Sequence, residues 1–302
     1  MRFGGRRTSE NVEFREGGRG GLGFGGGGMG GGAGMLLGLV FSRFGIGGVV
    51  VLVIIMFLLG GNPLGISGGG DQAVSPQQRT NGQTAAQVCG ADQQRQFLCQ
   101  VLASSEDQWT ALFSASGQTY QPPRLVFYRG GAPTGCGYGQ SAMGPFYCPA
   151  DQSIFLDTTF FDELAQRHGA PGDFAQAYVV AHEVGHHIQT ITGTASQIRQ
   201  AQQAVGRESE SNALQVRMEL QADCYAGVWA ARERSTLEAG DIQEGMTAAA
   251  AIGDDTLQRA GQGRVVPESF THGSSAQRQE ALMRGFQGGD PAACDAYTAG
   301  IR

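Results

Sequence analysis

Two histidines and a glutamate in the segment His182-Glu183-Val184-Gly185-His186 have the spacing of a catalytic metal site. Histidines four residues apart on a helix stand one turn apart on the same face, where two ring nitrogens can bind one Zn²⁺ ion. Glu183 lies between them on the flank and can act as a general base toward a water activated by the metal. The segment therefore predicts a hydrolytic zinc centre with His182 and His186 as ligands. A helix that carries histidines by chance is the alternative, and the apolar residues around the motif argue against it.

A catalytic zinc site usually has three protein ligands and one open position. Glu219 is the best candidate for the third ligand, because it lies on the next long predicted helix after His186. Asp223 follows one turn later on the same face, where it could accept the second ring N–H of a liganding histidine and fix its tautomer. A solvated acidic helix face is the alternative. Apolar residues along this helix predict that it is buried instead, where unpaired carboxylates are costly.

Other candidate residues have different expected roles. His272 lies in a loop before a helix, and that loop could fold over the metal. Its side chain could then donate a hydrogen bond to the oxyanion formed during peptide hydrolysis. Capping or a supporting contact is the alternative role for His272. His187 and Cys224 are each rotated away from the ligand face of their helix, so we expect both to pack elsewhere.

Short strands are predicted before a set of helices in the second part of the chain. The expected strands are 125–128 and 153–157, with a hairpin or loop over 130–149. The expected helices are 85–113, 160–168, 173–193, 195–205, 209–234, 241–260 and 275–287. Asp173 is expected to cap the helix that carries the metal motif. This order predicts an α+β, mainly helical domain with a small antiparallel sheet.

An uncharged apolar stretch over residues 44–61 predicts one transmembrane helix before this domain. As a helix it would reach about 27 Å, enough to cross the hydrocarbon core of a bilayer. The arginines of the chain's first part precede it, and Asp71 is the first charged residue after it, so the positive-inside rule predicts a cytoplasmic N-terminus. A cleavable signal peptide is the alternative, but the stretch begins far into the chain and no clear cleavage site follows.

The predicted organisation has four parts. Residues 1–43 form a cytoplasmic Arg/Gly-rich segment, 44–61 the transmembrane helix, 62–84 a flexible linker and 85–302 the metallopeptidase domain. The protein is thus expected in the inner or plasma membrane, with a single span and its catalytic domain in the periplasm or outside the cell.

The cysteines agree with an exported domain. All six lie after the predicted span, in a compartment that permits disulfides. Fifteen pairings are possible for six cysteines. Close spacing favours Cys89 with Cys99 and Cys136 with Cys148, which leaves Cys224 with Cys294. The net charge of −6 argues against nucleic acid as a partner, because the acidic surplus lies in this same part of the chain.

Several stretches resemble the bacterial putative neutral zinc metallopeptidase family. They are Met1-Arg2 with Gly5-Arg6-Arg7, Ser9-Glu10-Asn11-Val12-Glu13, residues 178–189, residues 217–229 (RMELQADCYAGVW) and residues 271–278 (THGSSAQR). The resemblance implies a membrane-anchored domain of the zincin type. More distantly, Glu219 and Asp223 are similar to the glutamate and aspartate of the gluzincin peptidases. The chain departs from the family in its opening, where Phe14 replaces an expected acid, and in its Gly-rich stretch at 17–34.

The leading hypothesis is therefore a membrane-anchored zinc endopeptidase that binds one Zn²⁺ ion per chain and hydrolyses a peptide or protein substrate. The alternative is a zincin-fold envelope protein that binds zinc for assembly or binding and cleaves nothing. Glu183 favours the peptidase, because a purely structural zinc site needs no general base and is normally closed by four protein ligands.

Overall fold

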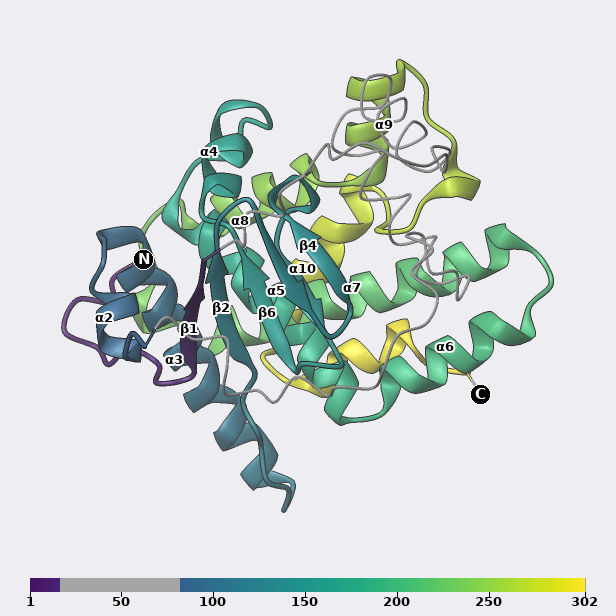
Figure 1. Cartoon of the computed structure of the whole chain (residues 1–302). Helices are drawn as coiled ribbons and strands as arrows, with labels where there is room; N and C mark the ends of the chain where they lie inside the picture. Colours follow the sequence, from purple (N-terminus) through teal and green to yellow (C-terminus); the bar gives the residue numbers. More distant parts are fainter. Residues whose placement is uncertain (17–81, 302) are drawn as a thin grey trace, which may run out of the picture.

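The computed structural model describes residues 1–16 and 82–301, which form small sheets beside a set of helices (Figure 1). The strands are β1 Val12–Arg15, β2 Arg124–Tyr128, β3 Gly131–Thr134, β4 Gly137–Gln140, β5 Phe146–Cys148 and β6 Ser153–Leu156. The α-helices are α2 Ala85–Cys89, α3 Gln93–Ala115, α4 Thr159–Gln166, α5 Asp173–Ile191, α6 Thr194–Ala204, α7 Glu208–Arg232, α8 Asp241–Ala251, α9 Asp254–Gln262 and α10 Ser275–Gly288. Short 3-10 turns follow several of them, including Pro291–Tyr297 near the C-terminus.

The main sheet is mixed, with the strand order β1-β2-β6-β5. β1 runs parallel to β2 and β2 parallel to β6, and only the pair of β5 with β6 is antiparallel. The predicted antiparallel sheet is therefore wrong for this part, although β3 and β4 do form a separate antiparallel hairpin. The reason is connectivity. Parallel strands need long crossovers, and here α2 and α3 lie between β1 and β2, and the hairpin lies between β2 and β6.

The first 16 residues are part of this folded body. Figure 1 shows β1 at the edge of the sheet beside β2, and Val12 pairs with Leu125. Met1 and Phe3 are buried in the same hydrophobic core as α3 and α5. The sequence predicted a separate segment that ends at residue 43. Residues 1–16 depart from that prediction, because their contacts are with residues 80 to 240 positions away, which local sequence patterns do not indicate.

The predicted membrane helix at 44–61 lies outside the described residues. Among residues 1–16 and 82–301, no helix combines the length and the apolar character that crossing a bilayer requires.

The helices follow the predicted order with three differences. The helix predicted over 85–113 is divided into α2 and α3. Asp173 is the first residue of α5 rather than its cap, and the carboxylate of Glu244 accepts the N–H of Phe174 at 3.1 Å. The helix predicted over 241–260 is divided at Gly253 into α8 and α9. A Cβ atom at Gly253 would lie 2.4 Å from the backbone nitrogen of Ser275, so the chain approaches the start of α10 too closely for a side chain.

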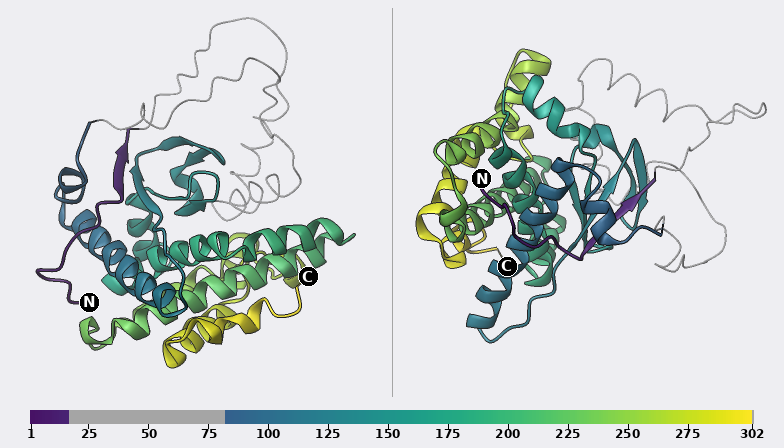
Figure 2. Two further views of the ribbon diagram at one scale, coloured as in Figure 1. Left: turned by 90° about the horizontal axis from the view of Figure 1, so that it is seen from below. Right: turned by 90° about the vertical axis from the view of Figure 1, so that its left-hand side faces the viewer.

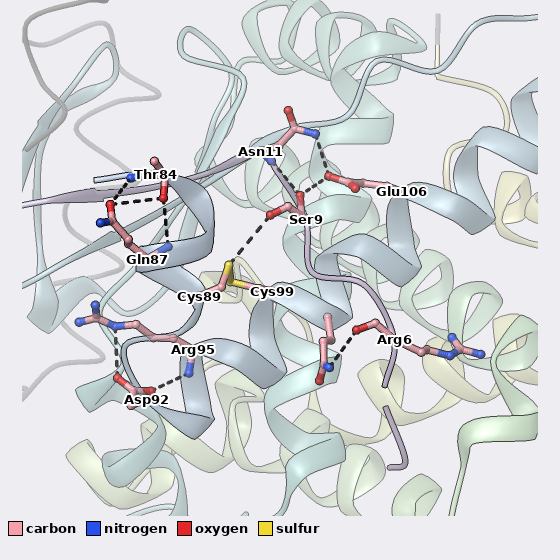
Figure 3. Close-up of a disulfide and its surroundings, with 11 residues drawn as sticks. Arg6, Ser9, Asn11, Thr84, Gln87, Cys89, Asp92, Arg95, Cys99 and Glu106 are labelled. Carbon is pink, nitrogen blue, oxygen red and sulfur yellow. Dashed lines mark hydrogen bonds and ion pairs between the residues drawn. A yellow bond between two sulfur atoms is a disulfide. The ribbon is translucent and has the colours of Figure 1, made fainter. Parts of the chain in front are cut away.

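All three predicted disulfides are present. Cys89–Cys99 joins α2 to α3 (Figure 3), Cys136–Cys148 joins the β3–β4 hairpin to β5, and Cys224–Cys294 joins α7 to the C-terminal turn. The long helices lie together on one side of the sheet (Figure 2). This arrangement places α5 between the sheet and α7, so that the predicted metal motif faces the helix that carries Glu219.

Candidate metal centre

Close packing of three helices positions the candidate site. A Cβ atom at Gly185 would lie 2.9 Å from the Cα atom of Ala222, so glycine lets α5 and α7 approach closely between the two histidines. On the other side of α7, a Cβ atom at Gly285 would lie 1.9 Å from the carbonyl oxygen of Cys224. The α10 helix therefore contacts the backbone of α7 directly. These two contacts bring residues of α5, α7 and α10 to one buried point.

Three donor atoms converge there. His182 Nε2 lies 3.1 Å from His186 Nε2, and Glu219 Oε2 lies 3.3 Å from the first and 3.4 Å from the second. Three ligands at 2.0–2.1 Å from one tetrahedral zinc ion would stand about 3.3–3.4 Å apart. The spacing of His182, His186 and Glu219 thus fits one zinc ion, with the geometry expected from the sequence.

The hydrogen bonds of the two imidazoles support the same conclusion. His182 Nδ1 lies 2.7 Å from Asp223 Oδ1, and His186 Nδ1 lies 2.9 Å from Gln189 Oε1. The amide nitrogen of Gln189 donates to the carbonyl of Met218, which leaves its oxygen as the acceptor. Both Nδ1 atoms are therefore placed to donate a proton, which leaves both Nε2 atoms able to bind a metal beside the carboxylate of Glu219. The three atoms fit a cation between them.

Asp223 is held by two further buried groups. Arg278 from α10 donates to both of its carboxylate oxygens, at 2.8 and 2.9 Å, and Tyr178 Oη donates to Oδ1 at 2.6 Å. Burial opposes ionisation of Asp223, but the charges of Arg278 and His182 outweigh it and lower its pKa to about 2. Asp223 is thus an ionised acceptor in a fixed position, which orients His182 as predicted.

Glu183 lies in the same buried environment without belonging to the set of donor atoms. Burial raises the pKa of its carboxyl group, and the charges of His186 and His182 oppose this shift. A carboxylate whose pKa moves toward neutrality is suited to accept a proton and release it again.

His272 is fixed by a carboxylate that was not predicted from the sequence. Asp254, the first residue of α9, accepts the backbone N–H groups of Thr271, His272 and Gly273 at 2.6–3.0 Å, and its second oxygen lies 3.3 Å from His272 Nδ1. Burial opposes the charged form of His272, but the hydrogen bond to Asp254 and the charge of Glu219 raise its pKa. His272 is therefore a fixed ring close enough to Glu219 to interact with its charge.

The residues expected to face away from the metal do so. His187 is fully buried between Tyr147, whose hydroxyl lies 3.0 Å from its Nδ1, and the carbonyl of Gln121. Cys224 forms its disulfide with Cys294.

Four residues of the site were not predicted from the sequence. They are Tyr178, Gln189, Asp254 and Arg278. Three of them lie in the stretches that resemble the family, Tyr178 and Gln189 at the ends of 178–189 and Arg278 at the end of 271–278, whereas Asp254 had no sequence signal.

A second group of carboxylates, from Asp173, Asp241 and Glu244, also comes within ligand distance of one another. It contains no histidine, and the α-amino nitrogen of Met1 lies 2.6 Å from Asp173 and 3.2 Å from Asp241. An ammonium already lies between two of these carboxylates, so we assign no metal to the group.

The sequence comparisons agree with the geometry. A family model described as putative neutral zinc metallopeptidase matches residues 1–297. The chain belongs to this family. It is 46% identical over 305 residues to the uncharacterized protein YpfJ of Escherichia coli strain K12, with both chains covered completely. It is 42% identical over 226 residues to the uncharacterized protein Rv2575 of Mycobacterium tuberculosis strain H37Rv, covering 70% of this chain and 74% of the relative. No solved structure matches the chain.

The family implies zinc, and the group His182, His186 and Glu219 is where the described residues could hold it. Because these relatives are themselves uncharacterized, family membership gives the class of the protein without its substrate.

Proposed function

We propose that this protein is a zinc-dependent peptidase in which His182, His186 and Glu219 bind the metal and Glu183 is the general base. The observation that carries the proposal is the convergence of three lone-pair donors at 3.1–3.4 Å, with the buried carboxylate of Glu183 beside them. A site with only three protein ligands leaves a position for water or substrate, which distinguishes catalytic from structural zinc sites.

Zinc bound at this site would polarise the scissile carbonyl and increase the acidity of water. Glu183 takes a proton from the attacking water and passes it to the leaving amine, a role for which its raised pKa is suited. Asp223 keeps the proton of His182 on Nδ1, so that Nε2 remains available as a donor atom. The hydrogen bonds of Asp223 fix the orientation of His182 before substrate arrives.

We assign His272 the role of stabilising the oxyanion. Asp254 bonds to its Nδ1 and to the backbone on both sides, so the other ring nitrogen is the one left for substrate. Its raised pKa favours a ring that donates hydrogen bonds, as a negatively charged oxygen requires. Asp254 then acts through His272 as a positioning residue.

The substrate is a peptide or protein, and we propose cleavage of internal bonds, as in an endopeptidase. We further propose that the domain works outside the cytoplasm, since three disulfides lie within it. The membrane helix at 44–61 remains a prediction from the sequence. The alternative function is a zinc-binding envelope protein without hydrolytic activity.

The Glu183→Gln variant tests this proposal. Purified full-length protein is incubated with a broad peptide library, and mass spectrometry identifies the products and the position of each cut. The wild type should cleave, and Glu183→Gln should lose roughly 10²–10⁴-fold in rate while it retains zinc. The matched control Glu280→Gln changes an exposed carboxylate on α10 and should keep full activity.

Wild-type protein that contains zinc and cleaves nothing in the library would favour the binding protein. Unchanged activity in Glu183→Gln would remove Glu183 as the base. Products shortened only from one end would contradict the endopeptidase assignment.

A further inference from the structure

The N-terminal segment, residues 1–16, carries arginines that the sequence assigns to the cytoplasmic side of a membrane span. In the structure, Arg2, Arg6 and Arg7 form ion pairs with acids of the metallopeptidase domain. We infer that residues 1–16 and residues 82–301 fold as one body in a single compartment, so that the N-terminal segment lies on the same side of the membrane as the metal centre.

Backbone hydrogen bonds join the segment to three parts of the domain. The N–H of Arg2 donates to Thr236 at 2.8 Å, the N–H of Ser9 donates to Cys99 at 3.1 Å, and the N–H of Leu125 donates to Asn11 at 2.8 Å. The last bond starts the parallel pairing of β1 with β2. A strand that is paired in a sheet and shares its core cannot lie across a bilayer from the rest of that sheet.

Charged contacts follow the same path. The guanidinium of Arg6 lies 2.6 Å from Glu233, and that of Arg7 lies 3.0 Å from Glu106. Glu106 is almost fully buried, and it also accepts hydrogen bonds from Ser9 Oγ at 2.5 Å and Asn11 Nδ2 at 2.8 Å (Figure 3). The segment thus supplies a cation and two donors to one buried carboxylate. A buried carboxylate without such partners is costly, so this contact is specific.

The segment also packs against a disulfide, which indicates an oxidising compartment. Figure 3 shows Ser9 beside the Cys89–Cys99 disulfide, and its N–H bonds to the carbonyl of Cys99. That disulfide forms where thiols are oxidised, outside the bacterial cytoplasm. If the disulfide forms there, the segment that packs against it folds there too.

The N-terminal arginines then have a structural role. Arg2, Arg6 and Arg7 bind Glu238, Glu233 and Glu106, so they stabilise the fold instead of marking a cytoplasmic end. Residues 16 and 82 then lie on the same side of any membrane, which conflicts with the predicted cytoplasmic N-terminus. The inference rests on contacts of the described residues and is independent of the proposed peptidase activity.

Cysteine labelling of the full chain tests the inference. Gly4→Cys marks the N-terminal segment and Gly206→Cys marks the domain; at both positions an added Cβ atom meets nothing within 4 Å. The described cysteines are all paired, so the parent protein gives the background. Spheroplasts that express each variant are treated with a membrane-impermeant maleimide, before and after lysis, and equal zinc content shows that both variants fold.

We expect the two positions to be labelled to the same extent in intact spheroplasts. Labelling of both positions only after lysis would also support one compartment, while contradicting the location that we propose for the domain. Labelling of Gly206→Cys in intact spheroplasts, with Gly4→Cys reached only after lysis, would overturn the inference. Loss of peptidase activity would affect none of these outcomes.

Discussion

Two networks of charged residues, one around the metal centre and one around the N-terminal segment, differ in how deeply their members are buried. In the metal-centre network, Arg278 and Asp223 are both almost completely buried. In the N-terminal network, Glu106 and Glu233 are buried but the arginines that bind them are about half exposed, as for Arg7 at 48% and Glu106 at 8%. The first network fixes the atoms of the site, whereas the second attaches a segment to the outside of the domain.

This difference indicates what each network can do. A buried ion pair gains little net stability over apolar packing. The loss of one partner, however, leaves an unpaired buried charge, which lowers the free energy of unfolding strongly. A half-exposed pair is screened by water, and its loss costs little. We therefore expect changes in the metal-centre network to affect zinc and stability together, and changes in the N-terminal network to affect stability alone.

The largest effect is expected from Arg278→Leu. This change leaves Asp223 buried without its cation, so the free energy of unfolding should fall by about 3–5 kcal/mol. Urea unfolding of the purified protein measures it. Arg284→Leu removes an exposed arginine of the same helix and should leave the unfolding midpoint unchanged. Equal unfolding midpoints of the two variants would show that the buried pair matters no more for stability than an exposed arginine does.

Asp223→Asn is expected to weaken the metal site as well as the fold, because it also leaves the buried Arg278 without its carboxylate. The amide is neutral and accepts the His182 Nδ1 proton more weakly, so zinc affinity should fall by roughly 10–100-fold. Competition with a chromophoric chelator measures the affinity. The neighbouring acid Glu210 lies at the exposed start of α7, and Glu210→Gln should bind zinc as the wild type does. If Asp223→Asn bound zinc with wild-type affinity, the carboxylate of Asp223 would have no role in supporting the metal centre.

Glu106→Gln should give the smallest effect and the clearest contrast. The amide introduced by this change would keep one acceptor oxygen but lose the charge that binds Arg7, so stability should fall on the order of 1 kcal/mol. Urea unfolding measures this loss, and zinc affinity should not change. Asp107→Asn, at an adjacent and largely exposed position, serves as the control. A weaker zinc site in Glu106→Gln would show that the two networks are coupled.

The sequence predicts the metal centre better than it predicts the sheet. His182, Glu183 and His186 share one helix, and Glu219 and Asp223 share the next, so helical periodicity was enough to place them on facing sides. The order of the helices and the three cysteine pairs were also predicted correctly.

Contacts between distant segments were not predicted. Asp254 reaches His272 only because Gly253 ends one helix and starts another against α10. β1 pairs with β2 across more than a hundred residues. Nothing in the local sequence around the preceding arginines indicates which acids they bind. Local patterns indicate elements and ligand spacing, whereas the partner of a strand depends on the assembled fold.

The zinc content of Glu219→Ala tests the central claim most directly. Wild type, Glu219→Ala and the control Glu210→Ala are dialysed against a mild chelator, and bound metal is measured by mass spectrometry. We predict one zinc ion per chain in the wild type and in Glu210→Ala, and loss of zinc from Glu219→Ala because only two ligands remain. Full zinc occupancy in Glu219→Ala would contradict a site built from two histidines of α5 and one glutamate of α7.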